Sequence, residues 1–577
     1  MPENIVSYKL SGALGKYLIN YSDGQYQIGI WDEKIKTESY LPLVSKRDSK
    51  READKILGNF IIKEGILVLL MGMASVPLIE ALIRQQEKYG GYIILFEADL
   101  VLAEYLANQF IKSRDEIAVI TPHNIEKLND FLEIFSAENI KGHRIFSLAS
   151  SKKLASKFYE ECEIIFKQTF SSLFSDLLTR LEFEISWIYN SIAQIVNFQR
   201  AYPVKKLFSK GNGYTAFLVS SGPSLRESLD ILKTVGNDVF VACVDSAYRV
   251  LYRSGIKPHL VISLDAQAYT TRHFLGLPMG KKNDFPILYA DIVSNPQVTT
   301  RWKGPLYLGT TAQYKDNIRS ITPGCDFLEE KLLLKNATGD IQSGGSVATS
   351  LFDLLRLMNF ENIIFIGQDL AYSYREIHSM GTHHSDAWLS SSTHRLETIE
   401  NINNKVLHKR HISFETSLQN RKIPADYVLS LYRGWFSEAI GRTEMNVYNM
   451  TKEGLPIENV KKINLSDFQA IKKKNVFFND FITSSASEKT EILDAKKAAT
   501  FYKDIQNENF NDDTINEFSF LQKIGRKFAL NANRLSGDET KKNRLLQKQV
   551  KEQEKFWRLL QRKSKSFLSV LEILSDR

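Results

Sequence analysis

Between residues 214 and 454, short hydrophobic runs alternate with segments of helical pattern. Because buried parallel strands read as continuous apolar runs, these runs predict strands. Helices are expected to start near residues 224, 246 and 346. The predicted strands are 215–220, 239–244, 259–264, 286–290, 305–309 and 362–367. This alternation is typical of an α/β fold with a central, doubly wound, mostly parallel sheet of Rossmann-like type.

A second α/β pattern precedes this region. Ile66–Leu70 and Tyr92–Phe96 read as strands on either side of a helix at Pro77–Gln86, and Glu97 and Asp99 follow the second strand. The first turn is Gly72-Met73-Ala74-Ser75 and not G-x-G-x-x-G, so a degenerate Rossmann-like domain is favoured over an active cofactor site.

The rest of the chain is mainly helical in pattern. Residues 150–200 are amphipathic, the strand signal fades after about residue 400, and Met445–Tyr448 reads as the last extended piece. We therefore predict three domains. They are an N-terminal α/β domain with a helical linker at 1–200, a central catalytic domain at 201–464 and a C-terminal helical domain at 465–577.

Composition fits a soluble cytoplasmic protein. Of 577 residues, 43% are hydrophobic and 25% charged, and the three cysteines are widely spaced, which favours a reducing compartment. The longest apolar stretch, Gly65–Ile79, is too short to span a bilayer, and the N-terminus lacks the features of a signal peptide. Residues 541–577 hold 11 Lys and Arg against 4 Asp and Glu, most of the net charge of +8. Because Leu546, Val550 and Trp557 recur there at near-helical spacing, a solvated helix face is favoured over a nucleic-acid or acidic partner.

Two glycine turns are the first candidates for chemistry. One is Ser220-Ser221-Gly222-Pro223-Ser224 after a predicted strand, and the other is Ser343-Gly344-Gly345-Ser346 before a predicted helix. Such turns leave backbone N–H groups at a helix N-terminus, where they can hold a phosphate. An ordinary strand-to-helix turn is the alternative for the first taken alone. Two such turns in one sheet domain favour a site for a nucleotide-activated substrate.

Polar residues also gather at the predicted carboxyl ends of strands, where ligands bind in doubly wound sheets. They are Asp245, Asp265, Gln267, Asp291, Gln368 and Asp369. A loop after Asp369 holds four of the chain's ten histidines, His378, His383, His384 and His394. Histidine is the usual general base near neutral pH, and we favour His383 or His384 for that role. A metal site is the rival interpretation, without a partner cysteine or H-E-x-x-H spacing to support it, and a polar surface loop is the other.

The motifs in this order resemble the motility-associated factor (Maf) family of flagellin glycosyltransferases, whose central domain is MptE-like. They are Gly-Pro-Ser-Leu, Ser-Leu-Asp, Gly-Gly-Ser-Val-Ala, and Gly-Gln-Asp-Leu-Ala-Tyr followed by Thr-His, between Tyr214 and Gly454. The resemblance implies transfer of a nonulosonic acid, of pseudaminic or legionaminic type, from CMP to Ser or Thr of flagellin in the cytoplasm. The central domain of the family is similar to bacterial sialyltransferases, which carry Asn where this chain has Ser221.

By that resemblance Gly222, Pro223 and Ser224 lie near the CMP, with Ser343, Gly344 and Gly345 opposite. Ser221, Ser346, Tyr372 and Thr382, with the acids and amides at the strand ends, complete the expected contacts to the CMP-sugar. His383, His384 and Asp369 are the expected catalytic residues, in an inverting transfer that requires no metal and no cofactor besides the donor. Two alternatives remain. One is an ATP- and Mg²⁺-dependent pterin pyrophosphokinase with Asp265 or Asp369 as metal ligand, and the other is a non-catalytic flagellin-binding module.

Overall fold

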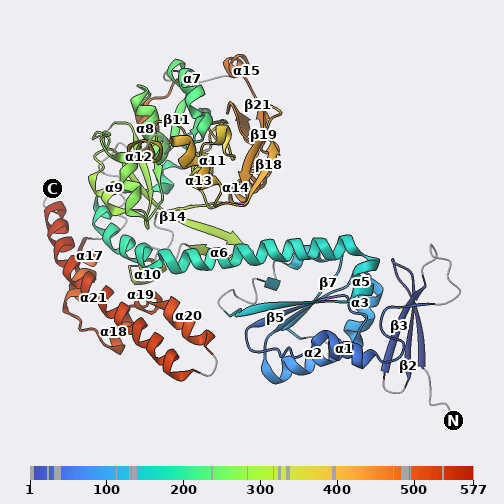
Figure 1. Cartoon of the computed structure of the whole chain (residues 1–577). Coiled ribbons are helices and arrows are strands. Elements are labelled where there is room, and N and C mark those ends of the chain that lie inside the picture. Colours follow the sequence, from blue (N-terminus) through green and yellow to red (C-terminus); the bar gives the residue numbers. More distant parts are fainter. Residues whose placement is uncertain are drawn as a thin grey trace, which may run out of the picture. The chain divides into compact units, whose positions relative to one another are not determined.

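The computed structural model divides the chain into two compact units (Figure 1). The first unit is Met1–Glu182 with Ala529–Leu545, and the second is Phe183–Phe528 with Leu546–Arg577. The residues that the structure describes are 6–22, 25–31, 40–111, 114–128, 131–132, 139–235, 238–282, 284–315, 318–321, 326–332, 338–392, 398–471, 474–482, 493, 495–535 and 538–575.

The first unit is built on a four-stranded parallel sheet in the order β7-β6-β5-β8. Its strands are β5 (Ile66–Met71), β6 (Tyr92–Phe96), β7 (Ile117–Ile120) and β8 (Gly142–Ser147). The helix α2 (Val76–Tyr89) connects β5 to β6, so the predicted strand–helix–strand pattern is confirmed. Further helices are α1 (Ser49–Leu57), α3 (Leu100–Leu106), α5 (Ala149–Leu154) and the start of α6 (Ser156–Gln194).

An antiparallel sheet opens the chain and covers part of this unit (Figure 1). Its strands are β1 (Val6–Ser11), β2 (Lys16–Ser22), β3 (Gln25–Trp31) and β4 (Leu41–Pro42). Ile19, Ile28 and Ile30 are fully or almost fully buried and share one hydrophobic core with Leu78 and Leu82 of α2. Their alternation along β2 and β3 explains why one face of the sheet packs on the helix.

The two acids after β6 are bound by the unit's own backbone. Glu97 accepts the Met73 N–H at 2.8 Å, and burial raises its pKa to about 7. Asp99 caps α3 through the Val101 N–H at 3.0 Å and also accepts the Leu14 N–H at 2.9 Å. In a working dinucleotide site these positions would face the ribose. Their internal bonds favour a structural role for this unit.

The second unit is built on a larger sheet in the order β15-β14-β13-β12-β11-β10-β17-β20-β21. All neighbours on this path are parallel except β14 and β15. The strands are β10 (Thr215–Val219), β11 (Phe240–Val244), β12 (Leu260–Ser263), β13 (Ile287–Asp291), β14 (Leu306–Lys315), β15 (Ile318–Ile321), β17 (Asn362–Ile366), β20 (Asn446–Asn449) and β21 (Lys461–Lys462), with β9 (Tyr202–Pro203) and β16 (Asp340–Ile341) also paired to β14. The predicted parallel, doubly wound sheet is confirmed, and its strand order reverses between β10 and β17.

Helices connect these strands. They are α7 (Leu229–Thr234), α8 (Asp245–Arg253), α9 (Pro296–Arg301), α10 (Asp326–Lys331), α11 (Val347–Leu357), α12 (His383–Ser391), α13 (Ile399–Leu407) and α14 (Tyr427–Gly441), with the 3-10 helices η5 (Pro223–Ser228) and η6 (Ala268–Phe274). A hairpin of β18 (Ile412–Thr416) and β19 (Lys422–Asp426) was not expected from the sequence. Because β18 is mostly exposed, it lacks the apolar signal of a buried strand.

The C-terminal region is helical in its described part, as predicted. Its helices are α15 (Leu465–Ala470), α16 (Phe478–Phe481), α17 (Ala495–Asn507), α18 (Asp512–Glu517), α19 (Phe520–Lys523), α20 (Arg526–Arg534) and α21 (Glu539–Ser575). Tyr502 of α17 donates to the Ile192 carbonyl at 2.7 Å, and its ring lies 5.2 Å from Phe567 of α21. These residues belong to the hydrophobic core that also contains the large sheet. Among the described helices, none is both long and apolar enough to cross a membrane.

Phe481 fixes the start of this region to the sheet, which generates a stability prediction. Its side chain is fully buried, and its ring lies 4.4 Å from that of Phe240 and 5.0 Å from that of Tyr214. Phe481→Ala should lower the free energy of unfolding by about 3–5 kcal/mol, because it removes the ring and leaves a cavity. Phe477→Ala is the matched control, since that ring is 60% exposed, and should change stability by less than about 0.5 kcal/mol. Urea denaturation measures both, and equal losses would contradict this role for Phe481.

Candidate active site

The turn after β10 is held against the end of β17 by one buried carboxyl group. The Ser224 N–H donates to Asp369 Oδ2 at 3.0 Å, and the Ser224 hydroxyl donates to Oδ1 at 2.6 Å. Asp369 is 2% exposed, and burial raises its pKa to about 7 although the bonds from Ser224 oppose that shift. With both oxygens bound to Ser224, Asp369 acts on the site as a positioning residue. Its expected catalytic role stays a prediction.

Glycine is required where this carboxyl approaches the backbone. A Cβ on Gly222 would lie 2.5 Å from both Asp369 Oδ1 and the Gly367 carbonyl oxygen. The Gly222 N–H also donates to that carbonyl at 2.9 Å. Gly454 is also close to Asp369, since a Cβ on Gly454 would lie 2.5 Å from the Asp369 carbonyl oxygen. The glycine-proline-serine turn is therefore shaped by the carboxyl group that it covers.

Several N–H groups expected to hold a phosphate already have acceptors in the protein. In the first turn, those of Gly222 and Ser224 bond to Gly367 and Asp369. In the second turn, the Gly344 and Ser346 N–H groups donate to Thr349 Oγ1 at 2.9 and 3.3 Å, and the Gly345 N–H donates to Ser343 Oγ at 3.1 Å. A ligand at these turns would therefore form its hydrogen bonds mainly with side chains, because these N–H groups already have acceptors.

The second turn packs tightly against α14. A Cβ on Gly344 would lie 2.3 Å from the Trp435 ring, and Gly345 has a φ of +92° that favours glycine. Ser346 caps α11 in a capping box with Thr349. Since α11 leads back into β17, its N-terminus lies at the carboxyl edge of the sheet, as expected. The proposed contacts of Ser343, Gly344, Gly345 and Ser346 with a ligand stay predictions.

The acids at the strand ends differ in exposure. Asp245, after β11, is 4% exposed and accepts the Ser246 N–H at 2.7 Å and the Ser263 hydroxyl at 3.0 Å. Burial raises its pKa to about 7. Asp265 and Gln267, after β12, are exposed, and the Gln267 N–H donates to Asp265 Oδ1 at 3.1 Å. The exposed side chains of Asp265 and Gln267 are therefore accessible to a ligand, whereas that of Asp245 is buried.

Asp291 after β13 is an internal group. It accepts the Val293 N–H at 2.8 Å and the Thr311 hydroxyl at 2.6 Å, and burial raises its pKa to about 6. Gln368 is also buried and accepts a hydrogen bond from the Ser220 hydroxyl. Both residues stabilise loops at the carboxyl edge.

A cluster of aromatic and imidazole rings forms where η6 meets His378 and the first turn of α12. His383 and His384 begin that helix, so the prediction that they lie on a loop was wrong. We call residues 378–384, which lead into and begin α12, the histidine loop. The ring of His384 lies 4.7 Å from that of His378, 5.2 Å from that of His273 and 5.1 Å from that of Tyr269. The Tyr269 hydroxyl lies 3.2 Å from His384 Nδ1. The His383 ring is 5.4 Å from that of Tyr269. We call these five residues the histidine cluster.

The imidazoles of the histidine cluster are less basic than an ordinary histidine. Burial and neighbouring imidazoles lower the pKa of His384 and of His273 to about 4, and burial lowers that of His378 to about 3. The pKa of His383 is lowered by burial and by the cations Arg249 and Arg272. Neutral imidazole can accept a proton, and a bound anion would raise these pKa values toward the neutral range.

Backbone and hydroxyl contacts connect the histidine cluster to the first glycine turn. The Ser379 N–H donates to the Ser221 carbonyl at 2.9 Å, and the Ser221 hydroxyl lies 2.8 Å from that of Ser246 at the start of α8. Thr382 is buried and caps α12, and its hydroxyl donates to the Ser379 carbonyl at 2.9 Å. Thus the turn, α8 and the histidine loop meet at one place.

Sequence reasoning missed some residues of this site. Tyr269 and His273 follow the β12 strand end closely, which was the available signal, and Ser246 follows Asp245. The expected contact of Tyr372 with a ligand stays a prediction. Its hydroxyl donates to Asp426 Oδ2 at 2.6 Å and accepts from Arg410 at 2.8 Å, and Tyr372 and Asp426 are buried whereas Arg410 is exposed. His394 lies outside the described residues. In the described part of the chain, no group of three or more His, Cys, Asp or Glu side chains forms a candidate metal site.

Two comparisons with known proteins find matches. Residues 188–375 match the family described as 6-hydroxymethylpterin diphosphokinase MptE-like. These residues contain the strands of the large sheet from β9 to β17. The fold is also similar to the solved structure of a Maf glycosyltransferase from Magnetospirillum magneticum AMB-1, with a TM-score of 0.54 and 12% sequence identity. That similarity covers 98% of this chain and 93% of the other. No curated protein sequence matches. The resemblance to Maf proteins with an MptE-like domain is thus confirmed for the fold.

The close approach at Gly222 generates a prediction. Gly222→Ala should lower the free energy of unfolding by about 1–3 kcal/mol or more, because the methyl group would push Asp369 away from Ser224. Gly434→Ala is the control, since Gly434 lies inside α14 with open space around it. This control should stabilise the chain by up to about 1 kcal/mol. Thermal denaturation measures both, and a neutral Gly222 variant would contradict the packing described.

The raised pKa of Asp369 predicts a pH dependence. Asp369 holds its proton more tightly when folded, so its contribution to stability is present below its ordinary value of 3.8 and is lost as pH rises toward about 7. Asp369→Asn cannot ionise. The melting temperature of this variant relative to wild type should therefore rise between pH 4 and pH 7 and then level off.

The matched control is Glu400→Gln, which removes an exposed carboxyl group on α13. Its melting temperature relative to wild type should show no such rise. A constant difference between Asp369→Asn and wild type over this pH range would show that Asp369 ionises as easily in the folded chain as in the unfolded one.

Proposed function

We propose that this protein is a glycosyltransferase that moves a nonulosonic acid, of pseudaminic or legionaminic type, from CMP to Ser or Thr of flagellin. It would act in the cytoplasm and serve flagellar assembly and motility. The observation that carries the proposal is the histidine cluster joined to the Ser221 turn at the carboxyl edge of the sheet. The fold similarity to a Maf glycosyltransferase over almost the whole chain supports it.

The donor would bind where the turn, α8 and the histidine loop meet. Ser221 and Ser246 offer hydroxyls there, and Asp265 and Gln267 offer exposed polar groups from the next strand end. Arg249 is held 3.2 Å from Asp386 of α12, so one guanidinium lies beside the histidine loop. These groups suit a ligand that carries hydroxyls, an amide-bearing base and negative charge.

In the transfer step the acceptor hydroxyl oxygen would attack the anomeric carbon of the sugar acid. The bond from that carbon to the phosphate oxygen breaks, and the departing CMP takes the electron pair. His384 or His383 would accept the hydroxyl proton, and one displacement inverts the anomeric centre. The negative charge of the donor would raise the pKa of the imidazole during this step and make it a better base.

The diphosphokinase alternative is favoured by the description of the matching family. It would need Asp265 or Asp369 to bind Mg²⁺ with ATP. Asp369 is buried with both oxygens bonded to Ser224, so a metal there would have to displace those bonds. This geometry disfavours Asp369 as the metal ligand and leaves the exposed Asp265 as the candidate for the diphosphokinase alternative.

The proposal is tested by His384→Gln and His383→Gln, each co-expressed with flagellin. At least one should lower the rate of glycosylation by about 100-fold or more, because the acceptor loses its general base. The control is His408→Gln, which changes an exposed histidine at the end of α13. Intact-mass analysis of flagellin measures the transferred sugar.

Full activity in both variants would place the base outside this loop. Flagellin that binds but never gains mass, even with wild type, would favour the binding-module alternative. A thermal-shift assay distinguishes the transferase from the diphosphokinase alternative, because a bound ligand stabilises the folded state. Stabilisation by ATP with Mg²⁺ and none by CMP would overturn the transferase proposal.

A further inference from the structure

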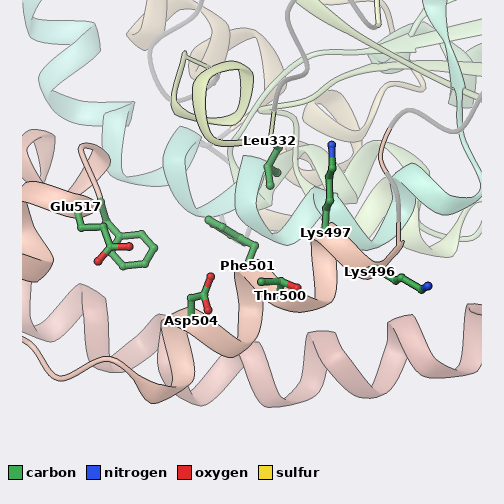
Figure 2. Close-up of a pocket in the computed structure, with 8 residues that line it drawn as sticks. Leu332, Lys496, Lys497, Thr500, Phe501, Asp504 and Glu517 are labelled. Carbon is green, nitrogen blue, oxygen red and sulfur yellow. The ribbon is translucent and has the colours of Figure 1, made fainter.

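The second unit holds cavities that lie away from the carboxyl edge. The first, of about 400 Å³, lies between the end of α10 and α17. Figure 2 shows Phe501 directed toward Leu332, with Lys497 near them and the carboxyl groups of Asp504 and Glu517 on the other side. Because its lining carries both signs of charge, this hollow selects no class of ligand.

The second cavity, of about 570 Å³, lies at the amino-terminal ends of β11, β12 and β13. It is therefore on the opposite edge of the sheet from the histidine cluster. Its walls include the flat rings of Tyr248, Tyr252 and Phe285, with Pro258 and Pro286. This volume is in the range of small-molecule sites, and such walls suit a planar ring.

His259 supplies a polar group inside this cavity. The residue is 7% exposed, and its Nδ1 accepts the Val241 N–H at 2.8 Å. Burial lowers its pKa to about 4, so the ring is neutral with its proton on Nε2. Phe240 stacks on the ring at 5.2 Å, and Phe285 meets it edge-on at 4.6 Å. Among the described residues, no hydrogen-bond partner of Nε2 is found, and His259 lines the cavity, so Nε2–H is available as a donor to a ligand there.

Positive charge surrounds the opening. Lys233, Lys257 and Lys281 line the cavity and are exposed, whereas Asp284 is the single acid in its lining. Lys233 lies 3.3 Å from Asp230, an exposed pair of little strength. Within the described ranges, Lys257 and Lys281 form no ion pair. The opening therefore favours an anion.

We propose that this cavity binds a nucleoside monophosphate. The heteroaromatic base lies between the aromatic and proline walls, and a ring nitrogen or carbonyl oxygen accepts the His259 Nε2–H. The phosphate lies at the opening, within reach of Lys257 and Lys281. This cavity shares no residue with the proposed transferase site, so the proposal of nucleotide binding does not depend on the proposed function.

The test uses AMP, GMP and UMP, each titrated into the whole chain by calorimetry at low salt. CMP is left out because the proposed function places it at the other edge. At least one of the three should bind at millimolar concentration or below, and binding should weaken with salt. Lys257→Ala with Lys281→Ala should weaken it at least tenfold and reduce the salt dependence. His259→Phe, which keeps a ring but removes both the Nε2–H donor and the acceptor of the Val241 N–H, should weaken it roughly tenfold.

Ser221→Ala is the matched control at the carboxyl edge and should leave this binding unchanged. The lysine pair is exposed, so that variant keeps the test decisive even if His259→Phe fails to fold. Binding by none of the three nucleotides would overturn the proposal. So would binding that survives the double lysine variant or is lost only in Ser221→Ala.

Discussion

The buried carboxyl group of Asp369 is the interaction on which the candidate site depends. It joins the end of β17 to the turn after β10, the two strands between which the sheet reverses its order. Burying a carboxyl group is unfavourable unless hydrogen bonds replace water, and Ser224 supplies two. Without a side chain at Gly222 the two segments can approach this closely. The turn fixed in this way presents Ser221, whose carbonyl holds Ser379 and with it the histidine loop.

The histidine cluster, which the Ser221 turn holds in place, has imidazoles with lowered pKa values. Its imidazoles pack against one another and against Tyr269, so protonating any one of them places a charge in a poorly solvated group beside other rings and cations. The cost of that charge keeps His384 neutral at pH 7. The negatively charged donor of the proposed function would raise the pKa of His384. The same group would then be a weak base without ligand and a stronger base with it.

The sheet was predictable from the sequence because buried parallel strands are continuous apolar runs, as in Phe240–Val244 and Asn362–Ile366. The hairpin at Ile412–Asp426 was not, since its first strand is largely exposed. The candidate site was predicted in part. The histidine loop and the Ser221 turn meet as expected, but the contributions of Tyr269 and His273 depend on tertiary contacts between segments more than 100 residues apart in the chain. The sequence also could not show that Asp369 is hydrogen-bonded to Ser224 and Tyr372 to Asp426.

These internal partners change where the specificity of the proposed transferase would lie. The N–H groups of Gly222, Ser224, Gly344 and Ser346 stabilise the turns themselves, so they act as scaffold. Charge on a donor would then be balanced mainly by side chains beside them, among them Arg249 and the imidazoles of the histidine cluster. The side chains of η6 and of the first turn of α12 lie outside the sheet, whereas the turns join its strands. On the proposed function, the turns would hold the strands together while these neighbouring side chains would select the sugar and the acceptor.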